Sequence, residues 1–342
     1  MSLRSRLRQR AKKHPRRAGR KAARADRAAI AELYERGRSA RVVALVASPD
    51  AAHDSGSIAV AVARRWAAHG RDVLVVDADA SGPALASRLG KATRAGFSPA
   101  LRGVPSLMAA RRPLSAAVLD EHCWRLGTAG HGSVRLLLGP TSTAGAPTAS
   151  AWLAQHADGL LAANADRHTI VSMTVSLLGG LEALLGAASA VVLLAPADTG
   201  ERFGALCAAS DSLIEAALHC SPCMVIDGST NRSHEEIRAA SGMHVAGRLD
   251  AVPERTLLGG RTRRRDARAA RTLDDLAARI AFLAADAGRE EPSQGAPEQQ
   301  QPPHGTVAPI TDNSDPRPER PMGGPASLGI ANGDAAPLRT GR

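Results

Sequence analysis

The sequence predicts an α/β protein, a three-layer sandwich in which helices flank a mostly parallel sheet. Short apolar runs recur between residues 41 and 285. These runs are continuously apolar instead of alternating, which is typical of parallel strands buried on both faces. Helix-like segments lie between several of them, and strands that alternate with helices indicate a layered α/β fold.

Seven runs are candidate strands, and they are rich in Val, Leu and Ala. They span 41–47, 72–79, 134–139, 168–173, 190–197, 223–228 and 244–249. Helices are predicted over 58–69, 105–119, 151–163 and 204–218, and a last helix over 271–285 carries Leu273, Leu276, Ile280 and Leu283 on one face. Aromatic residues make up only 2% of the chain, so small aliphatic side chains must fill the core.

Composition divides the chain into three parts. Residues 1–40 form a basic arm, expected to be largely disordered with a short helix over 28–38, and residues 41–285 form the α/β domain. Residues 286–342 are rich in Pro, Gly and Gln and hold few large apolar side chains. Such a tail cannot bury enough surface to offset its chain entropy, so we expect it to be disordered.

The net charge of +11 resides in the arm, because residues 1–27 hold twelve Arg or Lys and one acid. Such an arm is either a solubilising tail or a contact to non-specific nucleic acid or an anionic membrane surface. No Phe or Trp interrupts it, which favours nucleic acid. The candidate polyanion contacts are Arg4, Arg6, Arg8, Arg10, Lys12, Lys13, Arg16, Arg17, Arg20 and Lys21.

A second basic cluster precedes the last predicted helix. It contains Arg261, Arg263, Arg264 and Arg265. These side chains either form another phosphate-contacting patch or pair with Asp266, Asp274 and Asp275.

Localisation and metal content are constrained by what the sequence lacks. No apolar run approaches the ~20 residues that span a bilayer, and no apolar stretch of a secretory signal follows the basic N-terminus. We expect a cytoplasmic protein, free or associated with the nucleoid or a membrane. The pair CSPC (220–223) has metal spacing, but no second pair or nearby His cluster completes a site, so no metal is expected.

The loop SPDAAHDSGS (48–57) lies between a predicted strand and a predicted helix, as a phosphate-binding loop does. It has one glycine, Gly56, and no lysine. Backbone N–H groups near Ser55 and Ser57 could hold one anion weakly, but a plain helix-capping role for these serines is favoured. His53 either contacts a phosphate or, as favoured, is exposed and idle.

The order of these segments resembles the ParA/MinD superfamily of deviant-Walker ATPases, in the SIMIBI class of P-loop proteins. It is also similar to the cytoplasmic kinase domains of bacterial polysaccharide export. The resemblance covers about residues 41–283, where Asp77 and Asp79 match an Asp-x-Asp at a strand end and 168–175 matches the Walker B strand. It implies a P-loop NTPase-like fold.

Departures from that family concern the charged groups. By the resemblance, the two family lysines would fall on Ser55 and near Asp50, and the Walker B aspartate on Ser172. Phosphoryl transfer relies on such groups for positioning and charge stabilisation, so their joint loss implies a pseudo-ATPase with no catalytic residues. The remnant of the nucleotide loop comprises Asp54, Ser55, Gly56, Ser57, Asp77, Asp79 and Ser172.

Three functions are compatible with this resemblance. The first is a non-catalytic positioning or scaffold protein in DNA segregation, cell division or polar assembly. It would bind a protein partner such as a related ATPase, or a second copy as a homodimer, and no cofactor is expected. The second is an atypical active ATPase that binds ATP and Mg²⁺, with missing groups supplied by Arg64, Arg65 or a dimer partner. The third is a regulator of polysaccharide or secretion machinery, although the one tyrosine, Tyr34, argues against an autokinase.

Overall fold

The computed structural model of the 342-residue chain describes most of the predicted α/β domain. The described residues are 28–32, 42–48 and 51–286, except 52, 80–83, 94–96, 99–100, 128–130, 141, 176–180, 197–206, 208, 209, 212, 216, 218, 219, 221, 250, 251 and 259–265. The chain divides into two units, 1–294 and 295–342, and the second lies outside the described residues. The basic arm 1–27 and the cluster 261–265 also lie outside them.

An eight-stranded sheet forms the middle layer, in the order β3-β4-β2-β5-β1-β6-β7-β8. The strands are β1 (Val42–Ala47), β2 (Val73–Asp77), β3 (Trp124–Leu126), β4 (Val134–Leu137), β5 (His168–Thr174), β6 (Ala190–Pro196), β7 (Cys223–Asp227) and β8 (His244–Leu249). Neighbouring strands are parallel except β3 and β4. The seven predicted strands and the mostly parallel sheet are therefore confirmed, while the short strand β3 was not predicted.

Helices connect these strands. They are α3 (Ser55–Ala68), α4 (Ala84–Thr93), α5 (Val104–Ala110), α6 (Ala116–Glu121), α7 (Ala146–Gln155), α8 (Ala157–Ala163), α9 (Glu182–Gly186), α11 (His234–Ser241), α12 (Glu254–Leu257) and α13 (Ala267–Asp286). The single helix predicted over 105–119 is wrong in extent, because this segment forms two helices, α5 and α6. Arg111 ends α5 in the left-handed conformation (φ 49°), and Ser115 caps α6.

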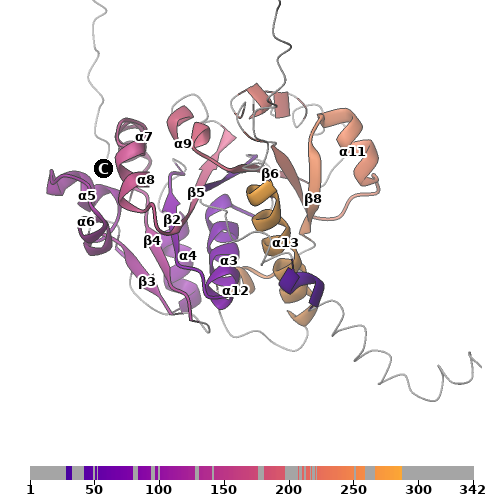
Figure 1. Ribbon diagram of the computed structural model, residues 1–342, viewed down its shortest axis with the longest axis horizontal. Helices are drawn as coiled ribbons and strands as arrows, with labels where there is room; N and C mark the ends of the chain where they lie inside the picture. The colour runs from indigo at the N-terminus through magenta and orange to yellow at the C-terminus, as the bar shows by residue number, and fades with distance from the viewer. Residues whose placement is uncertain are drawn as a thin grey trace, which may run out of the picture. The chain divides into compact units, whose positions relative to one another are not determined.

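Each face of the sheet packs against its own set of helices, which gives the predicted three layers (Figure 1). Val43 and Leu45 of β1 pack in one core with α3, α4, α12 and α13. Their neighbours Ala44 and Val46 pack in the other core with α5, α6, α7, α8, α9 and α11. Successive strand side chains point to opposite faces, so a continuously apolar strand serves both cores.

The contact between α3 and α13 fixes the helix that follows the loop 48–57. Trp66 of α3 is fully buried, and its indole N–H donates a hydrogen bond of 2.9 Å to the carbonyl of Ala277. One residue earlier, Arg65 pairs with Asp274 of α13, with Nε 2.6 Å from the carboxylate. These contacts hold α3 between the sheet and α13.

Replacing Trp66 tests this contact. Trp66→Phe keeps most of the apolar surface but removes the indole donor and leaves a small void, so we expect a loss of about 1–2 kcal/mol in the free energy of unfolding. Urea denaturation measures it. The matched variant Trp152→Phe, at a half-buried ring stacked on His156, should lose less. Equal losses in the two variants would contradict the special role of Trp66.

Candidate functional site

The loop between β1 and α3 lies at the carboxyl end of the central strand, where open parallel sheets bind their ligands. Asp77 and Ser172 are paired in the register of β2 and β5. The charges of Asp54 and Asp79 both act on Asp77. The structure therefore brings the predicted remnant residues together at one end of the sheet.

The amino terminus of α3 is capped by Asp54. One carboxylate oxygen, Oδ1, accepts a hydrogen bond of 2.8 Å from the backbone N–H of Ser57. The other oxygen, Oδ2, pairs with the guanidinium of Arg88 in α4, whose Nε lies 3.5 Å from Glu254. Backbone N–H groups and the helix dipole make this position attractive to an anion, and here the anionic group is the carboxylate of Asp54.

Gly56 allows this arrangement by its lack of a side chain. A Cβ at this position would lie 3.2 Å from Oδ1 of Asp54 and 3.2 Å from a methyl carbon of Leu85 in α4. Both contacts are tighter than ordinary van der Waals distances. The glycine thus admits a carboxylate and a neighbouring helix against α3.

The capping role predicted for Ser55 and Ser57 is wrong, because Asp54 is the N-cap. Both serines lie inside α3 with exposed fractions of 0% and 1%, and their hydroxyls have no hydrogen-bond partner among the described residues. A hydroxyl without a partner is costly to bury, by about 1–3 kcal/mol. Neither hydroxyl is accessible to a magnesium ion at the mouth of the loop.

The prediction that His53 is exposed and makes no contacts is wrong, because its ring is half-buried and contacts a carboxylate of the same chain. Its backbone N–H and ring Nδ1 both contact the buried carboxylate of Asp227, each at 2.6 Å, and its Nε2 lies 2.9 Å from the carbonyl of Val252. Both ring nitrogens lie beside oxygen atoms, an arrangement that favours the protonated ring. The hydrogen bond to Asp227 raises the pKa of His53 above its ordinary value of 6.5, against the opposing effect of burial.

Asp77 is a buried acid at the end of β2. Its carboxylate accepts long hydrogen bonds from the N–H groups of Gly139 (3.3 Å) and Asp79 (3.4 Å). Burial, and then repulsion from Asp79, raise its pKa to about 7. Beside it, the hydroxyl of Ser172 donates to the carbonyl of Val76 at 3.4 Å, inside the sheet. Within the described part of the chain, no three His, Cys, Asp or Glu side chains form a metal-binding group.

These residues do not fit a magnesium nucleotide. The carboxylate of Asp54 accepts the capping hydrogen bond at the amino terminus of α3, the hydroxyls of Ser55 and Ser57 are buried, and Ser172 is paired with Asp77 across β5 and β2. Among the described residues, Arg88 of α4 pairs with the loop residue Asp54, and the carboxylate of Glu254 also lies beside it. Arg65 cannot reach the loop of its own chain, because ten residues of helix place it roughly 15 Å from Ser55 and it pairs with α13.

Sequence reasoning missed Arg88, Asp227 and Glu254, which hold the loop in place. Arg88 lies in α4, which was not predicted, and Asp227 is 174 residues from His53 along the chain.

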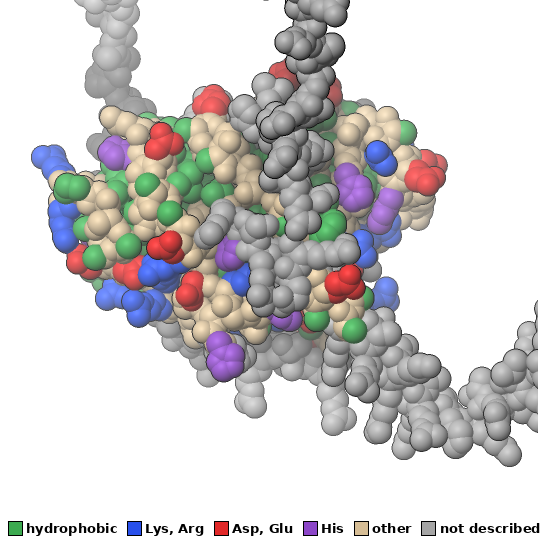
Figure 2. All heavy atoms as spheres, in the orientation of Figure 1, with side chains coloured by type: hydrophobic (Ala, Val, Ile, Leu, Met, Phe, Trp, Pro, Cys, Tyr) green, Lys and Arg blue, Asp and Glu red, His purple; other side chains and the backbone are tan. Residues whose placement is uncertain are grey.

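All of the predicted polyanion contacts lie outside the described residues. Within the described part, basic side chains gather over α5, α6 and β3 (Figure 2), where Arg102, Arg111, Arg112 and Arg125 are exposed.

Comparison with solved structures identifies the fold. The septum site-determining protein MinD of Pyrococcus horikoshii OT3, solved with Mg-ADP, is 13% identical with a TM-score of 0.53, and the match covers 73% of this chain and 99% of that one. MinD of Pyrococcus furiosus is 13% identical (TM-score 0.51; 71% and 99% covered), and a ParA family ATPase of Chlorobium tepidum TLS is 15% identical (TM-score 0.50; 70% and 99% covered). No family model and no curated protein matches the sequence.

The chain thus has the fold of MinD and ParA family ATPases, as the sequence resemblance implied. At these identities the similarity establishes the fold, so the site must be judged from its own residues. Among the described residues, every helix is too short or too polar to cross a bilayer.

The buried serines give a direct test of the altered loop. Ser55→Ala and Ser57→Ala each remove a buried hydroxyl without a described partner, so we expect each variant to gain about 1 kcal/mol in the free energy of unfolding. Urea denaturation with an unchanged m-value measures it. The matched control is Ser115→Ala, which should lose stability because Ser115 caps α6. Destabilisation by both α3 variants would show that these hydroxyls have a ligand or partner.

The His53–Asp227 pair gives a pH dependence. Because the pKa of His53 is raised in the folded protein, its stabilisation is fully present below the unfolded value of 6.5 and is lost as pH rises through the folded value. His53→Gln should therefore cost about 1–3 kcal/mol near pH 6 and less at pH 9. Urea titrations at several pH values measure this difference. The exposed His244 of β8 supplies the control, His244→Gln, and an equal cost in that variant would contradict the role of the His53–Asp227 pair.

Proposed function

We propose that this chain is a ParA/MinD-like pseudo-ATPase that works as a positioning or scaffold protein. The observation that supports the proposal is the cap of α3: the carboxylate of Asp54 accepts from the Ser57 N–H, at a helix terminus that would otherwise attract an anion. A protein with this loop keeps the fold of an ATPase, but its own Asp54 carboxylate would take the place of a bound anion at the start of α3.

Electrostatics support a site closed to nucleotide. A triphosphate at this helix terminus would have to displace Asp54 from the N–H of Ser57 and separate it from Arg88. If Asp54 stayed, two anions would share one helix terminus. The buried Asp77, whose pKa is raised to about 7, adds a group that disfavours further negative charge when it is ionised.

A positioning role follows from the fold and the basic arm together. Proteins of this fold include a septum site-determining protein and a ParA family ATPase. In this chain the arm 1–27, with the cluster 261–265, would attach the body to nucleic acid without sequence preference, or to an anionic membrane. The body would then recruit a protein partner, such as a related ATPase or a second copy of this chain, in DNA segregation, cell division or polar assembly.

An active ATPase is the alternative function. One neighbour of the same fold was solved with Mg-ADP, so the architecture itself can hold that ligand. Arg64 and Arg65 of the same chain lie nine and ten residues along α3 from Ser55, roughly 14–15 Å away by helix rise. The missing cation would therefore have to come from another protein or a dimer partner.

Nucleotide binding separates the two functions. We expect no saturable binding of Mg-ATP up to about 1 mM and no hydrolysis by the unaltered full chain. Asp54→Asn keeps a capping side chain but removes the charge, so it should raise the affinity for Mg-ATP or inorganic phosphate about tenfold. Asp158→Asn, at an exposed acid in α8, is the charge-matched control. Micromolar binding with turnover in the unaltered chain would overturn the pseudo-ATPase proposal.

The arm is tested separately on random duplex DNA. Full-length protein should shift the DNA, and raising the salt from ~50 mM to ~200 mM should weaken binding by about 10³-fold or more, because several phosphates are neutralised. A chain that begins at residue 28 should bind far less. If that deletion leaves DNA binding unchanged, the arm is not the contact. Vesicles containing an anionic lipid, in the same two-protein comparison, test the membrane alternative.

A further inference from the structure

The edge of the sheet at β3 carries an exposed basic surface. Within residues 101–127, four arginines accompany two acids, Asp120 and Glu121. All four arginines are exposed, and basic side chains gather over α5, α6 and β3 (Figure 2). No residue of the proposed nucleotide-loop remnant lies in this segment.

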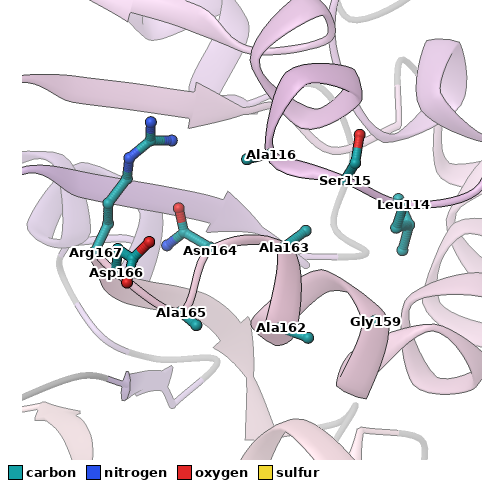
Figure 3. A pocket seen from close by; sticks show the side chains of 10 residues that line it. All are labelled: Leu114, Ser115, Ala116, Gly159, Ala162, Ala163, Asn164, Ala165, Asp166 and Arg167. Atoms are coloured by element: carbon teal, nitrogen blue, oxygen red, sulfur yellow. The ribbon is translucent and has the colours of Figure 1, made fainter.

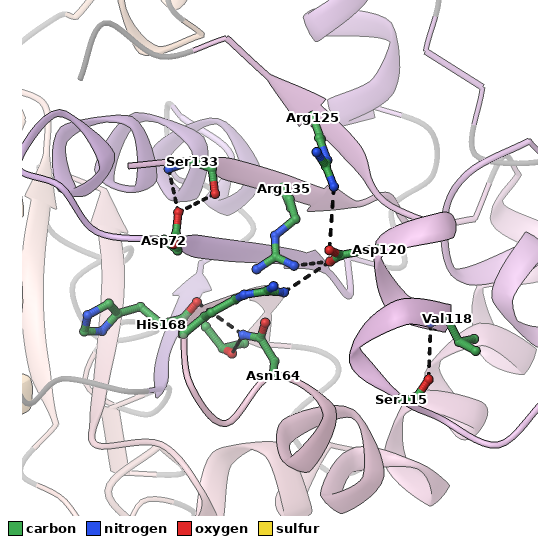
Figure 4. Close-up of polar contacts among 11 residues, drawn as sticks. Asp72, Ser115, Val118, Asp120, Arg125, Ser133, Arg135, Asn164 and His168 are labelled. Atoms are coloured by element: carbon green, nitrogen blue, oxygen red, sulfur yellow. Dashed lines mark hydrogen bonds and ion pairs between the residues drawn. The ribbon is translucent and has the colours of Figure 1, made fainter. Parts of the chain in front are cut away.

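Positive charge exceeds negative charge at this edge. Arg112 pairs with Glu121 at 2.6 Å, and Arg125, whose side chain is 72% exposed, lies 3.7 Å from the carboxylate of Asp120. The same carboxylate already contacts two further guanidinium groups, those of Arg135 and Arg167 (Figure 4). The two acids are therefore outnumbered, and the exposed arginines can pair with carboxylates of another molecule.

Arg167 marks one limit of the basic surface. It lines a hollow of about 530 Å³ between α6 and α8, and Asp166 stands next to it (Figure 3). The lining of the hollow carries one acid and one base, so its charges balance. The excess of positive charge thus lies on the side of Asp120 that faces β3.

An apolar side chain lies beside the arginines. Leu101 is 72% exposed, and among the described residues it is the one large hydrophobic side chain that is exposed. The guanidinium of its neighbour Arg102 lies 5.6 Å from the centre of the Trp124 ring, whose indole N–H donates to the Arg102 carbonyl at 2.9 Å. Arginine and tryptophan are enriched among the residues that dominate protein interfaces, and burial of an exposed leucine is favourable.

Arg111 has a backbone conformation that glycine adopts more easily. It ends α5 at φ 49°, and within the described part of the chain it is the one residue other than glycine with a positive φ. Helix α11 ends in the same left-handed conformation at Gly242. A side chain costs stability in this conformation, so an arginine here indicates a use for its exposed guanidinium.

We propose that this surface binds an acidic segment of a partner protein, in which a large apolar side chain is flanked by Asp or Glu. We call it the β3 surface, and it comprises Leu101, Arg102, Arg111, Arg112, Trp124 and Arg125. Carboxylates of the partner pair with the guanidinium groups, and its apolar side chain covers Leu101. The proposal rests on the recruiting role proposed above and gives that role a docking surface.

The spacing of the contacts suits a short segment. Helix α5 separates Leu101 from Arg111, and its 7 residues rise roughly 10 Å. About four residues of extended chain cover a comparable distance. One apolar residue with acids a few positions away can therefore contact both ends of α5.

The apolar component favours a protein partner over a nucleic acid. A phosphate backbone offers no apolar partner for Leu101. The ring of Trp124 already contacts Arg102 and Phe97, which leaves it poorly placed to stack on a base. A purely acidic chain would pair with the arginines but leave the leucine in water.

Fluorescence anisotropy of the full-length protein with labelled peptides tests the proposal. The probe is a short peptide in which a Leu-Phe pair is flanked by Glu residues. One control peptide replaces the pair by Ala-Ala, and the other replaces every Glu by Gln. We expect saturable binding of the probe and at least about tenfold weaker binding of either control. Contact through the basic arm alone would not depend on the Leu-Phe pair.

Variants of the β3 surface locate the contact. Leu101→Ser should weaken probe binding about tenfold and leave the Ala-Ala peptide unchanged. Arg125→Ser should weaken probe binding about threefold, as an exposed ion pair would. Its matched control is Arg238→Ser, at an exposed position of α11, which should leave binding unchanged.

Arg111→Gly separates binding from folding. It removes the strained side chain, so it should raise the urea midpoint while it weakens probe binding about threefold. The proposal is overturned if the unaltered protein does not bind the probe saturably, or if both Leu101→Ser and Arg111→Gly bind it as tightly as the unaltered protein. Loss of random duplex DNA binding in these two variants, with probe binding intact, would also overturn it in favour of a nucleic-acid surface. None of the variants alters the nucleotide-loop remnant, so failure here is distinguishable from Mg-ATP turnover, which would overturn the pseudo-ATPase proposal.

Discussion

The hydrogen bond from the Ser57 N–H to the carboxylate of Asp54 is the contact on which the rest of the site depends. It places a negative charge at the positive end of α3, and Arg88 neutralises that charge from α4. The next residue back along the loop, His53, binds Asp227 and Val252 on the other side. Two neighbouring loop residues therefore fasten α3 to α4, to the end of β7 and to the segment before α12. In this chain, ion pairs within the protein hold these two loop residues in place.

The helix behind the loop is held equally firmly. Trp66 and Arg65 attach α3 to α13 through one buried hydrogen bond and one ion pair. The first turn of α3 carries two buried serines whose hydroxyls have no described partner, which a protein keeps only at some cost in stability.

Both ends of the sheet leave buried polar atoms without a described partner. At the carboxyl end these are the hydroxyls of Ser55 and Ser57, whereas Asp54, Arg88 and His53 have partners within the chain. At the amino end of β5, a buried amide oxygen and two nitrogens of a buried arginine have none among the described residues.

The sequence by itself determined the layers of this protein. Continuously apolar runs such as 41–47 located seven strands, because strands buried on both faces must be apolar at every position. Through a family resemblance it also implied that charged groups are missing at Ser55 and Ser172, which stays a prediction. Tertiary structure alone decided which side chains hold the loop. Arg88 and Asp227 lie 34 and 174 residues from their partners in the loop, and no local pattern encodes a pairing over such distances. Hydrophobic periodicity reports burial, which is a local property, whereas the partner of a charge depends on how distant elements come together.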